Sequence, residues 1–167
     1  MDIIVIHGAP GCGKTTIAQK LHAALKSPWF EFGWIPEHRN LTPHTEISYE
    51  EEAQIAFENL ALVCRNYVRH GFENILLSDL EDRHVLSIPV ALDGLSYTIF
   101  TLYSESDDVI KQRILTRDNG NIYRDYEAAF LINQKIQQRS VLLHEIRIRS
   151  DNLSPDGITK QILSVIA

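Results

Sequence analysis

The sequence predicts an α/β protein in which helices cover a parallel β-sheet. Two observations carry this prediction. Short apolar runs of strand character alternate with amphipathic helical stretches along the chain. The run at 74–79 is apolar on both faces, which is typical of a central parallel strand. Hydrophobic residues make up 44% and charged residues 23%, so we expect residues 1–167 to form a single folded domain.

The first elements are expected in the order strand, helix, strand. Residues 2–7 form an apolar run, which predicts the first strand. Residues 14–26 carry apolar side chains at helical spacing, and Pro28 ends that helix. The aromatic stretch 29–35 is expected to be the second strand, and the polar residues 36–48 a long functional loop.

A long helix is expected next. Ser48 and Glu51 have the spacing of a capping box, and an apolar helical stripe runs from there to Gly71. The third strand is then residues 74–79. Residues 80–96 contain a proline and a glycine and are expected to be irregular.

The C-terminal part continues the alternation. Strands are expected at 97–103 and 144–149, with helices at 107–116 and 125–140 between them. Ser154 and Pro155 supply the cap and first position of a last helix.

A phosphate-binding loop is the strongest motif of the chain. Residues 8–15 read G-A-P-G-C-G-K-T, directly after the apolar run 3–6. In this pattern the glycines let backbone N–H groups point at a phosphate, Lys14 reaches the β- and γ-phosphates, and the Thr15 hydroxyl holds Mg²⁺. The residues expected to bind the triphosphate are Gly8, Ala9, Pro10, Gly11, Cys12, Gly13, Lys14, Thr15 and Thr16.

An acidic residue closes the third predicted strand. Ligands of parallel sheets bind at the carboxyl ends of strands, so we expect Asp79 to hold Mg²⁺ opposite Thr15. A turn or helix-cap aspartate is the alternative. Nearby, Arg83 either binds an anionic substrate or forms a surface ion pair with Glu81 or Asp82.

Arginines follow the fourth predicted strand. Arg113 and Arg117 lie four residues apart on one helix face, and Arg124 follows across a glycine-containing loop. We expect Arg113 and Arg117 to close over the triphosphate and stabilise the transferred charge. A solvated helix face is the alternative.

Phosphoryl transfer to a hydroxyl benefits from a carboxylate that orients it and accepts its proton. Glu31, Glu37 and Asp79 are the candidates. The segment 36–39 is our candidate acceptor patch, and Glu37 within it is assigned a catalytic role. His7 is expected to be a packed strand-end histidine.

Composition excludes other classes. The formal net charge of −6 makes nucleic-acid binding an unlikely function. Cys12 and Cys64 lack metal-ligand spacing, and no disulfide is expected between them. The sequence shows no leader peptide and no apolar stretch long enough to span a bilayer, so we expect a cytoplasmic protein.

Together these motifs resemble the small P-loop kinases of the shikimate, gluconate and adenylate kinase group. The likeness covers nearly the whole chain. It rests on four segments in order: residues 8–15; I-L-L-S-D at 75–79; V-I-K-Q-R-I-L-T-R at 109–117; and S-D-N-L-S-P at 150–155.

The resemblance implies a three-layer P-loop NTPase fold, with a five-stranded parallel sheet in the order 2-3-1-4-5. It also implies a short lid at about 113–125 that carries two of the arginines, Mg-ATP on the phosphate-binding loop, adenine against 149–154, and an acceptor between strands two and three. The chain departs from the shikimate branch at two places. Residues 32–37 stand where that branch has an aspartate pair, and 78–83 where it has a glycine-rich turn.

The sequence therefore predicts an ATP-dependent, Mg²⁺-using kinase of an unidentified small-molecule hydroxyl or phosphate acceptor. A nucleoside or nucleotide kinase, with Trp29, Trp34 or Tyr49 stacking on a base, is the first alternative. An ATP-binding NTPase or regulator without an acceptor is the second, and a nucleic-acid end kinase is disfavoured by the acidic balance. The sequence determines neither the acceptor nor the oligomeric state.

Overall fold

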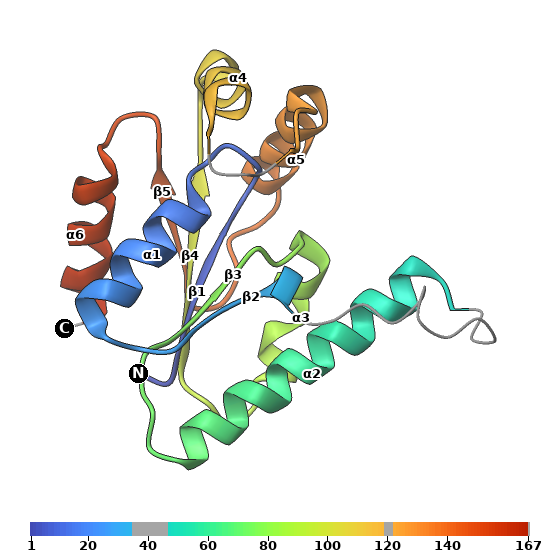
Figure 1. Ribbon diagram of the computed structural model, residues 1–167, viewed down its shortest axis with the longest axis vertical. Coiled ribbons are helices and arrows are strands. Elements are labelled where there is room, and N and C mark those ends of the chain that lie inside the picture. The colour runs from blue at the N-terminus through green and yellow to red at the C-terminus, as the bar shows by residue number, and fades with distance from the viewer. Residues whose placement is uncertain (35–46, 119–121, 167) are drawn as a thin grey trace.

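The described part of the chain is residues 1–34, 47–118 and 122–166 of a computed structural model. In it, five parallel strands form one sheet in the order β2-β3-β1-β4-β5 (Figure 1). The strands are β1 (Ile3–Gly8), β2 (Trp29–Glu31), β3 (Ile75–Ser78), β4 (Tyr97–Tyr103) and β5 (Glu145–Arg149). The predicted fold class and strand order are confirmed.

Helices cover both faces of this sheet and make the fold three-layered (Figure 1). One face is packed by α1 (Lys14–Leu25), α4 (Asp107–Thr116), α5 (Tyr126–Gln138) and α6 (Pro155–Ile166). The other face is packed by α2 (Tyr49–Arg69) and α3 (Asp82–Ala91).

The central strand β1 shows how the two cores are built. Ile3 and Val5 pack in the cluster with α2 and α3, whereas Ile4 and Ile6 pack in the cluster with α1, α4, α5 and α6. All four side chains are fully buried. Because alternate residues of a strand face opposite sides, an unbroken apolar run is required here.

Two expectations about secondary structure are wrong. Residues 80–96 are not irregular, because α3 occupies Asp82–Ala91 and continues through Pro89. Proline removes one helical hydrogen bond, but Val85 and Ile88 are fully buried, and this packing holds the helix. Strand β2 also ends earlier than expected, since its partner β3 ends at Ser78, and residues 32–34 turn into a 3₁₀ helix.

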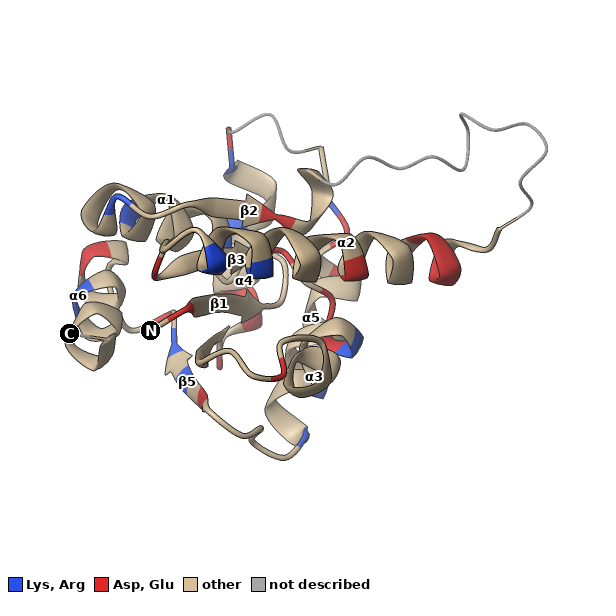
Figure 2. Cartoon of the chain, turned by 90° about the horizontal axis from the view of Figure 1, so that it is seen from below, with Lys and Arg blue, Asp and Glu red and all other residues tan. Residues whose placement is uncertain are grey.

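The capping box predicted for α2 is present. The Ser48 hydroxyl accepts a hydrogen bond from the Glu51 amide, and the Glu51 carboxylate accepts one from the Ser48 amide. Three glutamates occupy the first turn (Figure 2), where negative charge is favoured by the helix dipole. Among the described residues, no helix has the length and apolar character needed to cross a membrane.

Candidate active site

The loop between β1 and α1 has the backbone shape that its sequence predicts. Gly8, Gly11 and Gly13 have φ angles of 141°, 84° and 96°, which non-glycine residues rarely adopt. Gly13 is also the N-cap of α1, with no side chain to cap the first turn. The amides at this helix end are therefore available to an anion, and the helix dipole adds to the attraction.

Packing imposes a second demand on two of these glycines. A Cβ at Gly8 would lie 2.3 Å from the carbonyl oxygen of Leu102 in β4. A Cβ at Gly11 would lie 3.1 Å from the side chain of Ile114 in α4. Nothing lies within 4 Å of the corresponding position at Gly13. The loop is thus pressed against β4 and α4 at two points.

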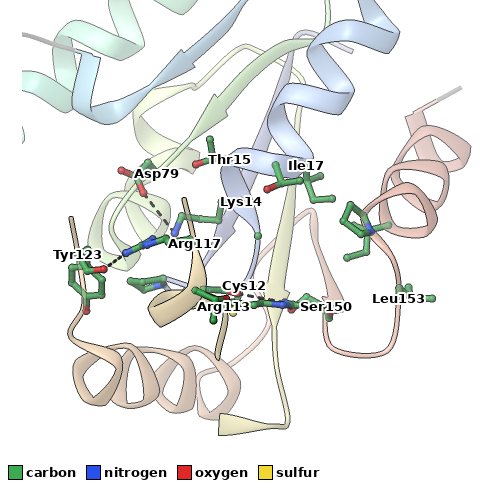
Figure 3. A pocket seen from close by; sticks show the side chains of 17 residues that line it. Cys12, Lys14, Thr15, Ile17, Asp79, Arg113, Arg117, Tyr123, Ser150 and Leu153 are labelled. Atoms are coloured by element: carbon green, nitrogen blue, oxygen red, sulfur yellow. Dashed lines mark hydrogen bonds and ion pairs between the residues drawn. The ribbon is translucent and has the colours of Figure 1, made fainter. Parts of the chain in front are cut away.

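Two clefts open beside the loop at the carboxyl end of the sheet. The first cleft has a volume of about 570 Å³ (Figure 3). It is lined by Pro10, Gly11, Cys12, Gly13, Lys14, Thr15, Thr16, Ile17, Asp79, Arg113, Thr116, Arg117, Tyr123, Ser150, Leu153, Pro155 and Ile158. Of the predicted triphosphate residues, Gly8 and Ala9 do not line it; Ala9 is fully buried.

The second cleft has a volume of about 600 Å³ and lies between the loop, α2, the start of α3 and α5. Its lining is His7, Gly8, Pro10, Lys14, Phe32, Gly33, Tyr49, Glu52, Ala53, Ala56, Asp79, Leu80, Glu81, Asp82, Arg83, Ile132, Lys135 and Ile136. Three residues line both clefts: Pro10, Lys14 and Asp79.

Lys14 and Asp79 form the boundary between the clefts. The Lys14 ammonium lies 3.6 Å from an Asp79 carboxylate oxygen (Figure 3). Asp79 follows β3 in the left-handed region, with φ of 64°, a conformation that is costly and concentrates at functional sites. The structure thus brings together two residues that are 65 positions apart, Lys14, predicted to bind the phosphates, and Asp79, predicted to hold Mg²⁺.

Glu31 at the end of β2 also reaches the loop. The Thr15 hydroxyl donates a hydrogen bond to the Glu31 carboxylate over 3.1 Å, and the Ser78 hydroxyl donates a longer one over 3.4 Å. The indole N–H of Trp29 in turn donates to Ser78 over 2.8 Å. Sequence reasoning considered Glu31 only as a base. Ligands of parallel sheets bind at the carboxyl ends of strands, and this rule could have identified Glu31, because Glu31 ends a strand beside β3.

The two predicted arginines have different surroundings. Arg113 donates to the backbone carbonyl of Ser150 over 2.8 Å and to that of Gly11 over 3.4 Å, so it ties the phosphate-binding loop to the segment after β5. Arg117 donates to the carbonyl of Tyr123 and lies over the Tyr123 ring (Figure 3). Burial, followed by the nearby Arg124, lowers the pKa of Arg117. Residues 119–121 of the predicted lid lie outside the described residues.

The remaining candidates have mixed outcomes. Glu37 and the whole patch 36–39 lie outside the described residues. Arg83 lines the second cleft and also forms the surface ion pair with Glu81, over 2.8 Å. His7 is buried at the end of β1, as expected. Trp34 is 54% exposed and packs on Trp29.

Both cysteines are buried and free. Burial raises the pKa of the Cys12 thiol, and it raises that of Cys64 to about 12. A thiol that stays protonated is a poor nucleophile and metal ligand. Among the described residues, no group of three or more His, Cys, Asp or Glu side chains is arranged to hold a metal ion.

The sequence matches one family model over part of its length. Residues 4–57 match the family model of the viral superfamily 1 RNA helicase core domain. A comparison of the sequence with curated proteins finds no significant match.

Solved structures resemble the whole chain. A sugar kinase from a Janibacter species has a TM-score of 0.72 at 18% identity, covering 98% of this chain and 93% of its own. A gluconokinase from Sinorhizobium meliloti has 0.66 at 12% identity, covering 96% and 89%. A shikimate kinase from Bacteroides thetaiotaomicron has 0.64 at 16% identity, covering 98% and 97%. The chain therefore has the fold of the small P-loop kinases.

Proposed function

We propose that this protein is an ATP-dependent kinase that phosphorylates a small molecule. The observation that carries the proposal is the boundary between the two clefts. A phosphoryl donor in the first cleft and an acceptor in the second would meet at Lys14 and Asp79. Phosphoryl transfer depends mainly on this kind of positioning and charge stabilisation.

The first cleft suits a nucleoside triphosphate. Backbone amides of the phosphate-binding loop face the phosphates, and Lys14 balances the charge at the β- and γ-positions. The lining of this cleft also includes Arg113, Leu153 and Pro155. A flat base fits between a guanidinium and apolar side chains, since arginine stacks on aromatic rings.

The residues around Thr15 fit a magnesium ion that accompanies the triphosphate. The Thr15 hydroxyl would supply one oxygen ligand, and phosphates and water would supply most of the others, as Mg²⁺ prefers. Glu31, bonded to that hydroxyl, adds negative charge next to the ion. When bound, the ion neutralises charge on the β- and γ-phosphate oxygens.

Asp79 is placed to orient the acceptor hydroxyl. It lines both clefts, and the Lys14 ammonium lies beside its carboxylate. Arg117 lies in the same cleft as Asp79 and is suited to stabilise the charge of the phosphoryl group in transit. The reaction class is therefore transfer to an oxygen nucleophile.

The test is ADP release from Mg-ATP against pooled acceptors: sugar acids, neutral polyols, nucleosides, monophosphates and amino alcohols. We expect one pool to raise turnover well above the rate in water, and Lys14→Ala to abolish the increase. Lys160→Ala, which removes an exposed lysine of α6, is the matched control. Tight Mg-ATP binding with every pool inactive would favour a nucleotide-binding regulator instead.

A nucleoside kinase is the second candidate. Tyr49 and Phe32 both line the second cleft, and aromatic rings there are suited to stack on a base. Stabilisation by nucleosides but not by sugars in a thermal-shift assay would favour this alternative.

A further inference from the structure

A buried chain of polar groups ends at the wall of the second cleft. It starts at Glu145 in β5, whose carboxylate is 0% exposed and accepts hydrogen bonds from both terminal nitrogens of Arg139. The Thr101 hydroxyl and the Leu142 amide also donate to Glu145. With this many bonds, the guanidinium of Arg139 is held in one orientation.

Arg139 in turn orients the carboxylate of Asp82, the first residue of α3. Its Nε donates to Asp82 Oδ1 over 2.9 Å. The same oxygen lies 3.1 Å from Nε2 of His7. Burial lowers the pKa of His7, so the neutral ring donates its Nε2 hydrogen to the carboxylate. Two donors, His7 in β1 and Arg139 at the C-terminal end of α5, thus converge on one oxygen atom.

The second oxygen of Asp82 is left for another donor. No residue in the described ranges donates a hydrogen bond to Oδ2 or pairs with it. The Asp82 side chain is 30% exposed, whereas that of Arg139 is 14% exposed, and Asp82 lines the second cleft. A carboxylate whose orientation is fixed from behind and whose other oxygen faces a cleft is built to accept a hydrogen bond from a ligand.

The charge of the cleft lining points to the kind of ligand. The described lining contains three cations, Lys14, Arg83 and Lys135, and four carboxylates: Glu52, Asp79, Glu81 and Asp82. Lys14 is paired with Asp79, and Arg83 with Glu81. The described lining therefore has no surplus of positive charge with which to attract an acid.

The apolar side chains of the lining indicate which ligand shape fits the second cleft. Phe32, Leu80, Ile132 and Ile136 line the same cleft, with Ala53 and Ala56 of α2. Such a surface suits a ring or another compact apolar body, with a few polar groups fixing its orientation.

On the basis of the proposed kinase function, we propose that Asp82 determines acceptor specificity. Its outward oxygen accepts a hydrogen bond from a hydroxyl or ammonium group of the acceptor, and the second cleft selects neutral or cationic alcohols over acids. Arg139 and His7 are positioning residues that act through Asp82.

The first experiment compares acceptors that differ mainly in charge: glucitol with gluconate, and methyl shikimate with shikimate. ADP release from Mg-ATP is measured for each. Within an accepted pair, we expect the neutral member to have at least tenfold higher kcat/KM than the acid. Across the pools, we expect neutral or cationic alcohols to exceed acids by the same factor. Preference for the acid overturns the inference and leaves the kinase function standing. Inactivity of every pair and pool, with Mg-ATP binding intact, overturns the proposed function itself.

The second experiment uses Asp82→Asn with the best acceptor found. We expect its KM for that acceptor to rise about ten- to hundredfold, the range for a hydrogen bond to a charged group. The KM for Mg-ATP should change much less, because Asp82 does not line the first cleft. Asp93→Asn, at the other end of α3, is the matched control.

Glu145→Gln separates specificity from stability, because it loosens Arg139 without altering the cleft lining. We expect it to lower the melting temperature and to keep the preference for the neutral acceptor. If Asp82→Asn lowers the melting temperature as Glu145→Gln does but leaves the acceptor KM unchanged, the role of Asp82 is structural and the proposal is wrong.

Discussion

The Thr15 hydroxyl donates a hydrogen bond to the Glu31 carboxylate over 3.1 Å, which links the phosphate-binding loop to the edge strand β2. This pair joins the residue expected to hold Mg²⁺ to a carboxylate from another strand. The contact gives the proposed metal site a negative charge beyond that of Asp79, and it has a measurable consequence.

Glu31→Gln should raise the Mg²⁺ concentration needed for half-maximal activity by about tenfold, because one charge beside the ion is lost. The measurement is a Mg²⁺ titration of ADP release at fixed ATP. Glu73→Gln, an exposed glutamate before β3, is the control. An unchanged Mg²⁺ requirement would show that Glu31 only supports Thr15 structurally.

Gly8→Ala should cost more stability than Gly13→Ala. At Gly8 the new methyl group would meet the backbone carbonyl of Leu102 at 2.3 Å, so β1 and β4 must separate. At Gly13 only the positive φ is strained, at a cost of about 1–2 kcal/mol. Urea unfolding of both variants measures the difference, and equal losses would contradict this account of the loop.

Arg113→Ala and Arg117→Ala should affect different properties, nucleotide binding in the first variant and kcat in the second. Arg113 bonds to the carbonyls of Gly11 and Ser150, so its loss should weaken Mg-ATP binding and lower the melting temperature. Arg117 contacts Tyr123 instead, and its loss should mainly lower kcat. Steady-state kinetics with nucleotide titrations will decide, and matching effects on kcat would argue against separate roles.

The polar chain behind Asp82 should make the fold sensitive to acid. Burial opposes the charge of Glu145, but hydrogen bonds from Arg139, Thr101 and the Leu142 amide lower its pKa from 4.5 to about 2. The resulting stability, about 3 kcal/mol, is present above pH 4.5 and is lost as pH falls toward 2. Burial also lowers the pKa of His7, so protonation of the unfolded chain below its ordinary value of 6.5 acts in the same direction.

Urea unfolding between pH 7 and pH 3 tests this dependence. The free energy of unfolding should fall as pH decreases, first below about 6.5 and more steeply below 4.5. Glu145→Gln should flatten the steeper part, since the variant has no carboxylate to protonate there. If Glu145→Gln keeps the full acid dependence of stability, other residues are responsible for it.

The sequence was most informative where local pattern and function coincide. The strand, loop and helix at 3–25 are readable because an unbroken apolar run, glycines and a lysine occur together. Helix α3 was missed because Pro89 outweighed its apolar spacing, although burial of Val85 and Ile88 decides the structure. This is tertiary packing overriding a local preference.

Relations between distant residues were beyond the sequence. Asp82, Arg139 and Glu145 each look like a surface charge when read singly, and their convergence depends on β5 lying next to β4. Even with the correct strand order, which residues share an oxygen atom is a matter of side-chain geometry. The candidate base Glu37 stays a prediction.

The central place of β1 has a consequence for biosynthesis. This strand leaves the ribosome before the other four strands of the sheet, yet both of its neighbours are encoded far downstream: β3 begins at Ile75 and β4 at Tyr97. Until they emerge, its apolar residues and unpaired backbone have no native partner, and long-range pairing of this kind is slow. A chain interrupted before Tyr97 would expose β1 along one edge, so truncated translation products should be targets for chaperones and proteases.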